Sequence, residues 1–347
     1  MKKRTIQIVL TLLLSALALY IALHGIDFKD VGTALSKVSW PWVIVTLALI
    51  LVTLLIRAQR WRILLGRTLS LQDTFGLIGI GYLISGVLPL RAGDPARAVG
   101  ASVRGPVTAL TALSTVVVER VLDMLLIVLI LLATLPFVPG LQSYLAEGQV
   151  NEFLSFNLVL ALSGILAFGI LLAFVLIAIF PLATERFARG ILQRLGISDT
   201  ERWLRPVQGV VQGLSALRSP KDGLAIVLWS VVLWGVTTAY FATMMWGSRA
   251  FLPETSILMS LVAVWSSAFG MVFPATGGIG SFHFAVREAL YWGFDVSRDL
   301  GFAYAVLVHA LPYLTGIALG ALILVLWGIS LKSLVNRGQE IEASAPD

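Results

Sequence analysis

The sequence predicts an all-α, polytopic helical membrane protein. Three observations support this fold class: 58% of the 347 residues are hydrophobic, only 13% are charged, and the mean hydropathy is +0.92. An ordinary soluble domain carries about 25% charged residues. A soluble protein with the composition of this chain would therefore expose too much apolar surface to water. The apolar runs are long and continuous rather than short and alternating. They therefore favour membrane-spanning helices over a transmembrane barrel.

Six apolar stretches are long enough to cross a bilayer core of about 30 Å as helices. They are Thr5–Leu23, Trp42–Leu65, Pro106–Leu135, Leu154–Pro181, Gly223–Trp246 and Gly301–Leu331. The first of these follows a basic N-terminus and shows no small-residue cleavage site, so we expect an uncleaved helix. We expect one membrane domain over residues 1–335 and a disordered cytoplasmic tail over residues 336–347.

The basic residues predict the orientation of the chain in the cell membrane, because cytoplasmic loops are enriched in Lys and Arg. Basic residues at both ends of the chain place both termini in the cytoplasm: Lys2, Lys3, Arg4, Lys332 and Arg337. The second span leads back to four arginines that indicate a cytoplasmic cluster: Arg57, Arg60, Arg62 and Arg67. Residues 183–222 indicate a basic, amphipathic cytoplasmic connector. The net charge of +6 is therefore attributed to topology, not to nucleic-acid binding.

Two further apolar stretches, Leu71–Leu90 and Ser256–Trp292, are interrupted by proline and glycine. The orientation requires the first stretch, with its return Arg91–Arg104, to begin and end on the cytoplasmic side. It therefore forms a re-entrant hairpin, or two crossings of which the second is poorly apolar. Ser256–Phe273 and Ser281–Trp292 must begin and end outside. They form a second hairpin that enters from the opposite face.

The two interruptions resemble each other. SGVLPLRAG, residues 85–93, and GMVFPATGG, residues 270–278, both place glycine four residues after proline. Interrupted segments at corresponding places in two halves point to the binding site of a transporter with inverted repeats. The alternative is that proline and glycine are simply common in membrane helices. The expected structural hinges are Pro89, Gly93, Pro274, Gly277, Gly278 and Gly280.

Polar residues beside the first interruption are candidates for substrate binding. Arg91 and Arg97 can hold a phosphate bidentately. Asp94 followed by Pro95 is typical of a helix start with aspartate as N-cap, and such a helix N-terminus favours anions. The alternative is a cytoplasmic turn whose arginines contact lipid headgroups nonspecifically.

A second candidate cluster lies deep inside an apolar helix. Glu119 and Asp123 share a helix face, and Arg120 is spaced to pair with Asp123. One charge at the bilayer centre costs at least about 2.5–3.5 kcal/mol, so three together predict a polar cavity wall. The alternative is a structural ion-pair network. Protonation of Glu119 or Asp123 is also a hypothesis for proton coupling.

A third candidate group follows the second interruption. Ser281 is a plausible N-cap, and His283 and Arg287 share a helix face where they can meet an anion. The alternative for His283 is an interfacial histidine with satisfied hydrogen bonds. His309 is expected to bond to a neighbouring helix. The chain has no cysteine and its three histidines are widely separated, so we expect no metal and no cofactor.

The motifs LPLRAGDPAR, VVVERVLD and FPATGGIGSFHFAVRE together resemble the lysylphosphatidylglycerol synthase transmembrane-region family, the flippase-like integral membrane proteins. The resemblance extends from about Lys3 to Val335. Two departures stand out: Asp94 replaces the usual glutamate of the first motif, and Ser85-Gly86 stands where the family often has asparagine. Bifunctional members carry an aminoacyltransferase domain that this sequence lacks. We therefore expect a stand-alone member.

The resemblance implies transbilayer movement of a lipid with an anionic phosphate headgroup. That lipid is a phosphatidylglycerol-type phospholipid or a polyprenyl-phosphate-linked sugar. The sequence is compatible with a homo-oligomer and does not decide whether one forms. Two alternatives from other classes remain: a membrane-embedded lipid-modifying enzyme that uses Glu119 and Asp123 as acid and base, and a non-transporting lipid-binding accessory subunit. No nucleotide-binding motif is present in the sequence. Movement would therefore be downhill, coupled to ions or driven by a partner.

Overall fold

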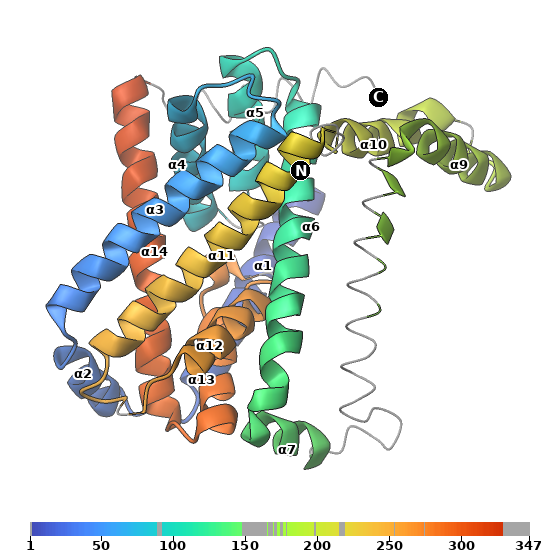
Figure 1. The fold of residues 1–347 in the computed structure, drawn as a ribbon. Helices are drawn as coiled ribbons and strands as arrows, with labels where there is room; N and C mark the ends of the chain where they lie inside the picture. The colour runs from blue at the N-terminus through green and yellow to red at the C-terminus, as the bar shows by residue number, and fades with distance from the viewer. Residues whose placement is uncertain are drawn as a thin grey trace.

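The structure is a computed structural model in which every regular element of the described residues is a helix. It describes residues 2–88, 92–147, 179–197, 199–214, 219–252, 254–273 and 275–328, with isolated residues and pairs between 165 and 177. The predicted all-α class is confirmed, and the helices form a bundle (Figure 1). Most of the expected span Leu154–Pro181, the residues Pro89, Arg91 and Pro274, and the tail 336–347 lie outside the described residues.

Five long helices coincide with expected spans. They are α1 (Lys2–Leu23), α3 (Trp40–Leu64), α6 (Ala109–Thr134), α11 (Pro220–Gly247) and α14 (Arg298–Trp327). Within the described residues, α3, α11 and α14 are long and apolar enough to cross a membrane. Serine or threonine hydroxyls cap the N-termini of several of these helices. For example, the Thr108 hydroxyl accepts a hydrogen bond from the Thr111 amide at the start of α6.

Two short helices were not expected from the sequence. They are α2 (Phe28–Ser36) and α7 (Pro139–Glu147). Both lie at the lower end of the bundle in Figure 1. Asp27 caps α2 by accepting a hydrogen bond from the Lys29 amide. Such helices are too short to stand out from the loop composition around them.

The two interrupted stretches form two helical hairpins. The first consists of α4 (Leu71–Val87) and α5 (Gly93–Arg104), and the second of α12 (Ile257–Gly270), the 3-10 turn η3 (Thr276–Gly278) and α13 (Ser281–Phe294). Gly93 lets α5 approach α4 closely, because an added Cβ would collide with the carbonyl oxygen of Gly81. Ser85 at the end of α4 accepts a hydrogen bond from the Gly93 amide.

Both hairpins pack along α14, one on each half of it. Gly76 near the start of α4 lies against Trp327 at the end of α14. At the other end, Glu288 on α13 accepts hydrogen bonds from Arg298 in the first turn of α14. The hairpins therefore enter the bundle from opposite ends, as the sequence predicted, and Figure 1 shows α5 and α13 at opposite ends.

The hairpin tips meet at Tyr313 in the middle of α14. The Tyr313 hydroxyl donates a 2.7 Å hydrogen bond to the carbonyl oxygen of Gly86 on α4. The same ring lies against Gly277 in the tip of the second hairpin. One tyrosine therefore contacts both tips.

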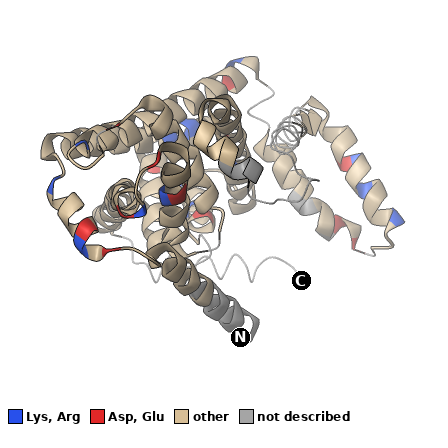
Figure 2. Cartoon of the chain, turned by 90° about the horizontal axis from the view of Figure 1, so that it is seen from below, with Lys and Arg blue, Asp and Glu red and all other residues tan. Residues whose placement is uncertain are grey.

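The expected connector contains two helices, α9 (Pro181–Arg194) and α10 (Thr200–Gly213). α10 packs on α6, whereas α9 buries none of its residues and projects sideways from the bundle (Figure 1). Figure 2 shows basic and acidic positions along this arm. Phe187 on α9 is exposed beside the basic residue Arg186, and Leu195, directly after the helix, is also exposed. The amphipathic, cytoplasmic character of this connector stays a prediction.

We predict that Gly93→Ala destabilises the first hairpin. The added methyl group has no space between α5 and α4, and overpacking of this kind costs about 1–3 kcal/mol. The thermal unfolding midpoint of the detergent-solubilised protein should fall. Gly235→Ala is the matched control, because a Cβ at this position of α11 meets nothing within 4 Å. Equal midpoints for the two variants would contradict the close packing of α4 and α5.

Candidate functional site

A chain of buried ion pairs connects α3, α5 and α6. Four arginines and three carboxylates of the described residues alternate along it, and we call these residues the charge ladder: Arg57, Asp123, Arg60, Glu119, Arg97, Asp94 and Arg120. Each carboxylate lies between two arginines, and an arginine stands at each end. The order of charge is therefore positive, negative, positive, and so on to a final positive charge.

The most deeply buried member of the ladder is Arg60 on α3. Its side chain is 0% exposed. It donates to Asp123 Oδ1 at 2.6 Å, to Asp123 Oδ2 at 3.1 Å and to Glu119 Oε1 at 2.9 Å. The hydroxyl of Ser230 on α11 accepts a further hydrogen bond from Arg60, at 3.1 Å. This guanidinium therefore ties three helices together.

The ladder continues from Glu119 towards α5. Glu119 Oε2 accepts a 2.8 Å hydrogen bond from Arg97, whose guanidinium lies 4.8 Å from the ring centre of Trp61. Arg97 also lies 3.3 Å from Asp94. Asp94 in turn accepts hydrogen bonds from Arg120 at 2.9 Å. On each of α3, α5 and α6, two members of the ladder are three or four residues apart and therefore share one helix face.

The ends of the ladder differ from its centre. The side chain of Arg120 is 41% exposed and that of Arg57 is 16% exposed, whereas Glu119 is 2% exposed. Four positive charges against three negative charges leave one positive charge in excess. The buried Nε atoms of Arg57, Arg60 and Arg97 also have no hydrogen-bond partner among the described residues. The ladder can therefore accept one further anion, most openly beside Arg120.

The expectation for Asp94 was wrong. The N-cap of α5 is Ala92, and the helix begins at Gly93. Asp94 lies inside the first turn, where its carboxylate binds Arg120 and Arg97. The expected pairing of Arg120 with Asp123 was also wrong, because Arg120 turns towards α5. The burial of Glu119 and Asp123 on one face of α6 is confirmed.

Sequence reasoning missed two members of the ladder. Arg57 and Arg60 were assigned to a cytoplasmic cluster, but both lie within α3 and Arg60 is fully buried. Their spacing of three residues within an apolar stretch was the available signal, since it puts both on one helix face. Arg67, by contrast, follows the end of α3 and pairs with Asp222 at 2.7 Å.

The third candidate group does not meet at one point. Gly280, not Ser281, is the N-cap of α13, and the Ser281 hydroxyl donates to the carbonyl oxygen of Gly278 at 3.4 Å. Arg287 donates to the carbonyl oxygen of Ala22 and to Glu288. His283 instead contacts His309 on α14. The expected hinges Gly277, Gly278 and Gly280 all have positive φ, which confirms a turn that needs glycine.

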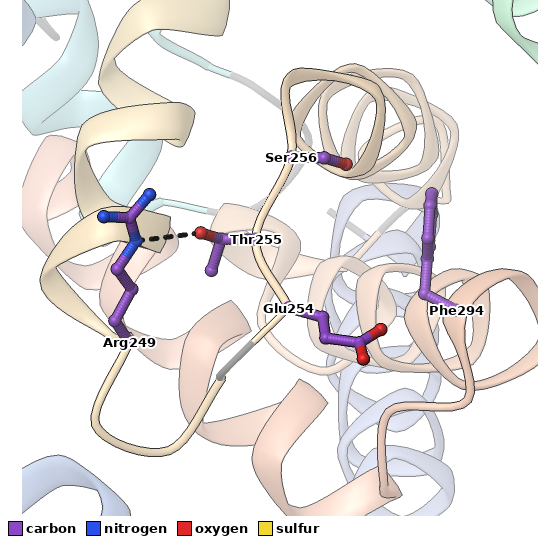
Figure 3. A pocket seen from close by; sticks show the side chains of 5 residues that line it. All are labelled: Arg249, Glu254, Thr255, Ser256 and Phe294. Atoms are coloured by element: carbon purple, nitrogen blue, oxygen red, sulfur yellow. Dashed lines mark hydrogen bonds between the residues drawn. The ribbon is translucent and has the colours of Figure 1, made fainter.

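Two pockets lie at the end of the bundle opposite the first hairpin. One has a volume of about 560 Å³ and is lined by Arg249, Glu254, Thr255, Ser256 and Phe294. Figure 3 shows Arg249 donating to the Thr255 hydroxyl, a distance of 3.1 Å. The other, of about 520 Å³, is lined by Tyr20, Ile21, His24, Gly25, Phe284, Arg287, Glu288 and Arg298. No member of the charge ladder lines either pocket.

Comparison with known proteins gives one match. A family model described as the lysylphosphatidylglycerol synthase TM region matches residues 8–320. No curated protein and no solved structure matches the chain. The matched range includes every member of the charge ladder and both hairpins.

We predict that Arg60→Met strongly destabilises the protein. The change leaves Glu119 with one arginine and Asp123 with its longer contact to Arg57. Breaking a buried ion pair by removal of one partner costs about 3–5 kcal/mol, so the thermal unfolding midpoint should fall sharply.

The double variant Arg60→Met/Glu119→Gln is the matched comparison. It removes one charge of each sign, and it leaves Arg57 beside Asp123 and Arg97 beside Asp94. It should recover part of the lost stability. A double variant less stable than Arg60→Met would show that charge alternation is not what holds these helices together.

Proposed function

The chain belongs to the lysylphosphatidylglycerol synthase transmembrane-region family, and from this premise we propose that it moves a lipid with an anionic, phosphate-containing headgroup between the two leaflets. The family indicates a membrane protein that handles lipid. The step from lipid handling to transbilayer movement is our proposal. It covers phosphatidylglycerol-type phospholipids and polyprenyl-phosphate-linked sugars.

The alternation of the charge ladder is the observation that carries this proposal. The ladder ends in a positive charge at Arg120, its most exposed member. A phosphodiester beside Arg120 would add one negative charge, extend the alternation and neutralise the excess. Arginine suits this role because its planar guanidinium binds phosphate oxygens bidentately.

Asp94 keeps such a site reversible. Asp94 accepts hydrogen bonds from Arg120 Nε at 3.2 Å and from Arg120 Nη2 at 2.9 Å. The guanidinium therefore keeps a carboxylate partner whether or not a phosphate is bound. A headgroup can then leave without exposing an unpaired charge to the membrane, which would be costly.

The paired hairpins support a route across the membrane. Their tips meet at Tyr313. The charge ladder lies in the half of the bundle that contains the first hairpin, and the pocket lined by Arg287 and Arg298 lies at the opposite end. Interrupted helices at a shared centre are the arrangement of transporters that expose one site to two sides in turn. The headgroup would pass between the tips while the acyl chains stay in the bilayer.

We predict that the purified protein accelerates the leaflet exchange of headgroup-labelled phosphatidylglycerol in proteoliposomes. Polyprenyl phosphate and the zwitterionic phosphatidylcholine are compared in the same assay. Arg120→Ala should slow the exchange of the anionic lipids by about tenfold to a hundredfold, because a hydrogen bond to a charged group is worth about 1.5–3 kcal/mol.

Arg189→Ala is the matched control for Arg120→Ala. Arg189 on α9 is similarly exposed and is also paired with one carboxylate, that of Glu201. Its removal should leave exchange unchanged. Exchange no faster than in protein-free liposomes would refute transport of these lipids. Covalently altered lipid, detected by mass spectrometry, would favour a lipid-modifying enzyme instead.

A further inference from the structure

Two histidines join the tip of the second hairpin to α14. His283 lies in the first turn of α13 and His309 in the middle of α14. His283 Nε2 lies 3.4 Å from His309 Nδ1, and His309 Nε2 lies 2.9 Å from the carbonyl oxygen of Gly277. The amide of Gly280 donates to His283 Nδ1 at 3.3 Å. The two rings and the turn 277–280 thus form a closed circuit, which we call the histidine latch.

The partners at its ends fix the protonation of both rings. The carbonyl oxygen of Gly277 can only accept, so His309 Nε2 must carry a proton. The amide of Gly280 can only donate, so His283 Nδ1 must accept and His283 Nε2 must donate to His309 Nδ1. Both histidines are therefore neutral, and every ring nitrogen has a hydrogen-bond partner.

A single proton breaks this circuit. An imidazolium has two N–H donors and no acceptor. Protonation of His283 at Nδ1 sets its N–H against the Gly280 amide, and protonation of His309 at Nδ1 sets its N–H against that of His283. Either event breaks one hydrogen bond and places two donors face to face.

The surroundings of the latch offer little to offset a positive charge. Phe282 stacks on His309 with ring centres 4.5 Å apart, and Phe302 lies 5.5 Å from His283. From α14, Tyr313 adds a phenol 5.6 Å from His309. From α1, the Ser15 hydroxyl accepts from the Thr276 amide in the tip. The nearest charged group described on α13 is Arg287, one turn further on, which binds Glu288 and Ala22.

We propose that the histidine latch is a proton-binding site that couples lipid movement to protons, and that protonation releases the tip of the second hairpin from α14. This inference rests on the proposed function, because it assigns the coupling ion for that movement. The charge ladder is a poorer proton acceptor. Glu119 and Asp123 already accept hydrogen bonds from arginines, so a proton would have to displace a guanidinium.

The direction of the pH dependence follows from linkage. The latched state requires neutral rings, whereas a hydrated histidine in the released state gains its proton near about pH 6.5. Acid therefore favours release. Below about pH 6.5 the ratio of released to latched protein rises by up to about tenfold per pH unit for each histidine. Above this value both states are neutral and the effect disappears.

A fluorescent label on the hairpin tip tests the proposal. The chain has no cysteine, so Ile279→Cys, at an exposed position between Gly278 and Gly280, provides one site for a bimane dye in proteoliposomes. Quenching by aqueous iodide is measured between about pH 7.5 and about pH 5.5. We expect quenching to rise on acidification. His283→Gln and His309→Gln should each weaken this rise and the double variant should abolish it, because glutamine hydrogen-bonds but takes up no proton.

His24→Gln is the matched control. His24 is the third histidine of the chain and has no part in the latch, so this variant should keep the rise. Quenching independent of pH with all histidines present would overturn the proposal, as would a rise that survives in full in the double variant His283→Gln/His309→Gln. Nitrogen NMR of histidine-labelled protein without these substitutions gives a second readout. It should show His283 and His309 protonated on Nε2 at neutral pH, and any other pair of tautomers would overturn the latch.

Lipid exchange in the same vesicles separates this proposal from the function it rests on. If the tip responds to pH but no lipid crosses, the latch stands and the proposed transport falls. If lipid crosses at one rate at every pH and the tip does not respond, transport stands and the proton site falls.

Discussion

The structure depends on one constraint: charges placed inside a membrane bundle must be partnered there. The charge ladder satisfies this constraint by alternation, so that each of Asp123, Glu119 and Asp94 lies between two arginines. Removing any inner member would leave a neighbour with half of its partners. The same alternation fixes the relative positions of α3, α5 and α6, because each helix contributes members to consecutive pairs.

The ladder and the hairpins form one arrangement. α5 supplies Asp94 and Arg97 and is also the returning arm of the first hairpin, so any movement of that hairpin changes the exposed end of the ladder. α14 contacts both hairpins through Tyr313 and His309. The geometry therefore places the exposed end of the charge ladder beside one hairpin and a neutral polar contact on the other, with α14 between them.

Much of the fold could be predicted from the sequence. The long spans follow from hydropathy, and the opposite entry of the hairpins follows from loop charges together with the proline and glycine at each interruption. The burial of Glu119 and Asp123 follows from their depth in an apolar helix. The pairing could not be predicted, because Arg120 meets Asp94 across 26 positions of the chain, a separation that no local spacing reveals. The positive-inside rule assigned Arg60 to a cytoplasmic cluster, because that rule does not consider which arginines share a helix face. The histidine latch also joins two separate helices.

The central claim is that a lipid phosphate completes the charge ladder at Arg120. The most direct measurement is the dipolar coupling between phosphorus and the guanidinium nitrogens of labelled Arg120, in nanodiscs that contain phosphatidylglycerol. The account predicts a phosphorus atom about 4 Å from these nitrogens, the separation of a guanidinium that hydrogen-bonds a phosphate oxygen. It also predicts that the coupling disappears in nanodiscs of a neutral glycolipid. A phosphatidylglycerol sample without coupling to Arg120 would contradict the account.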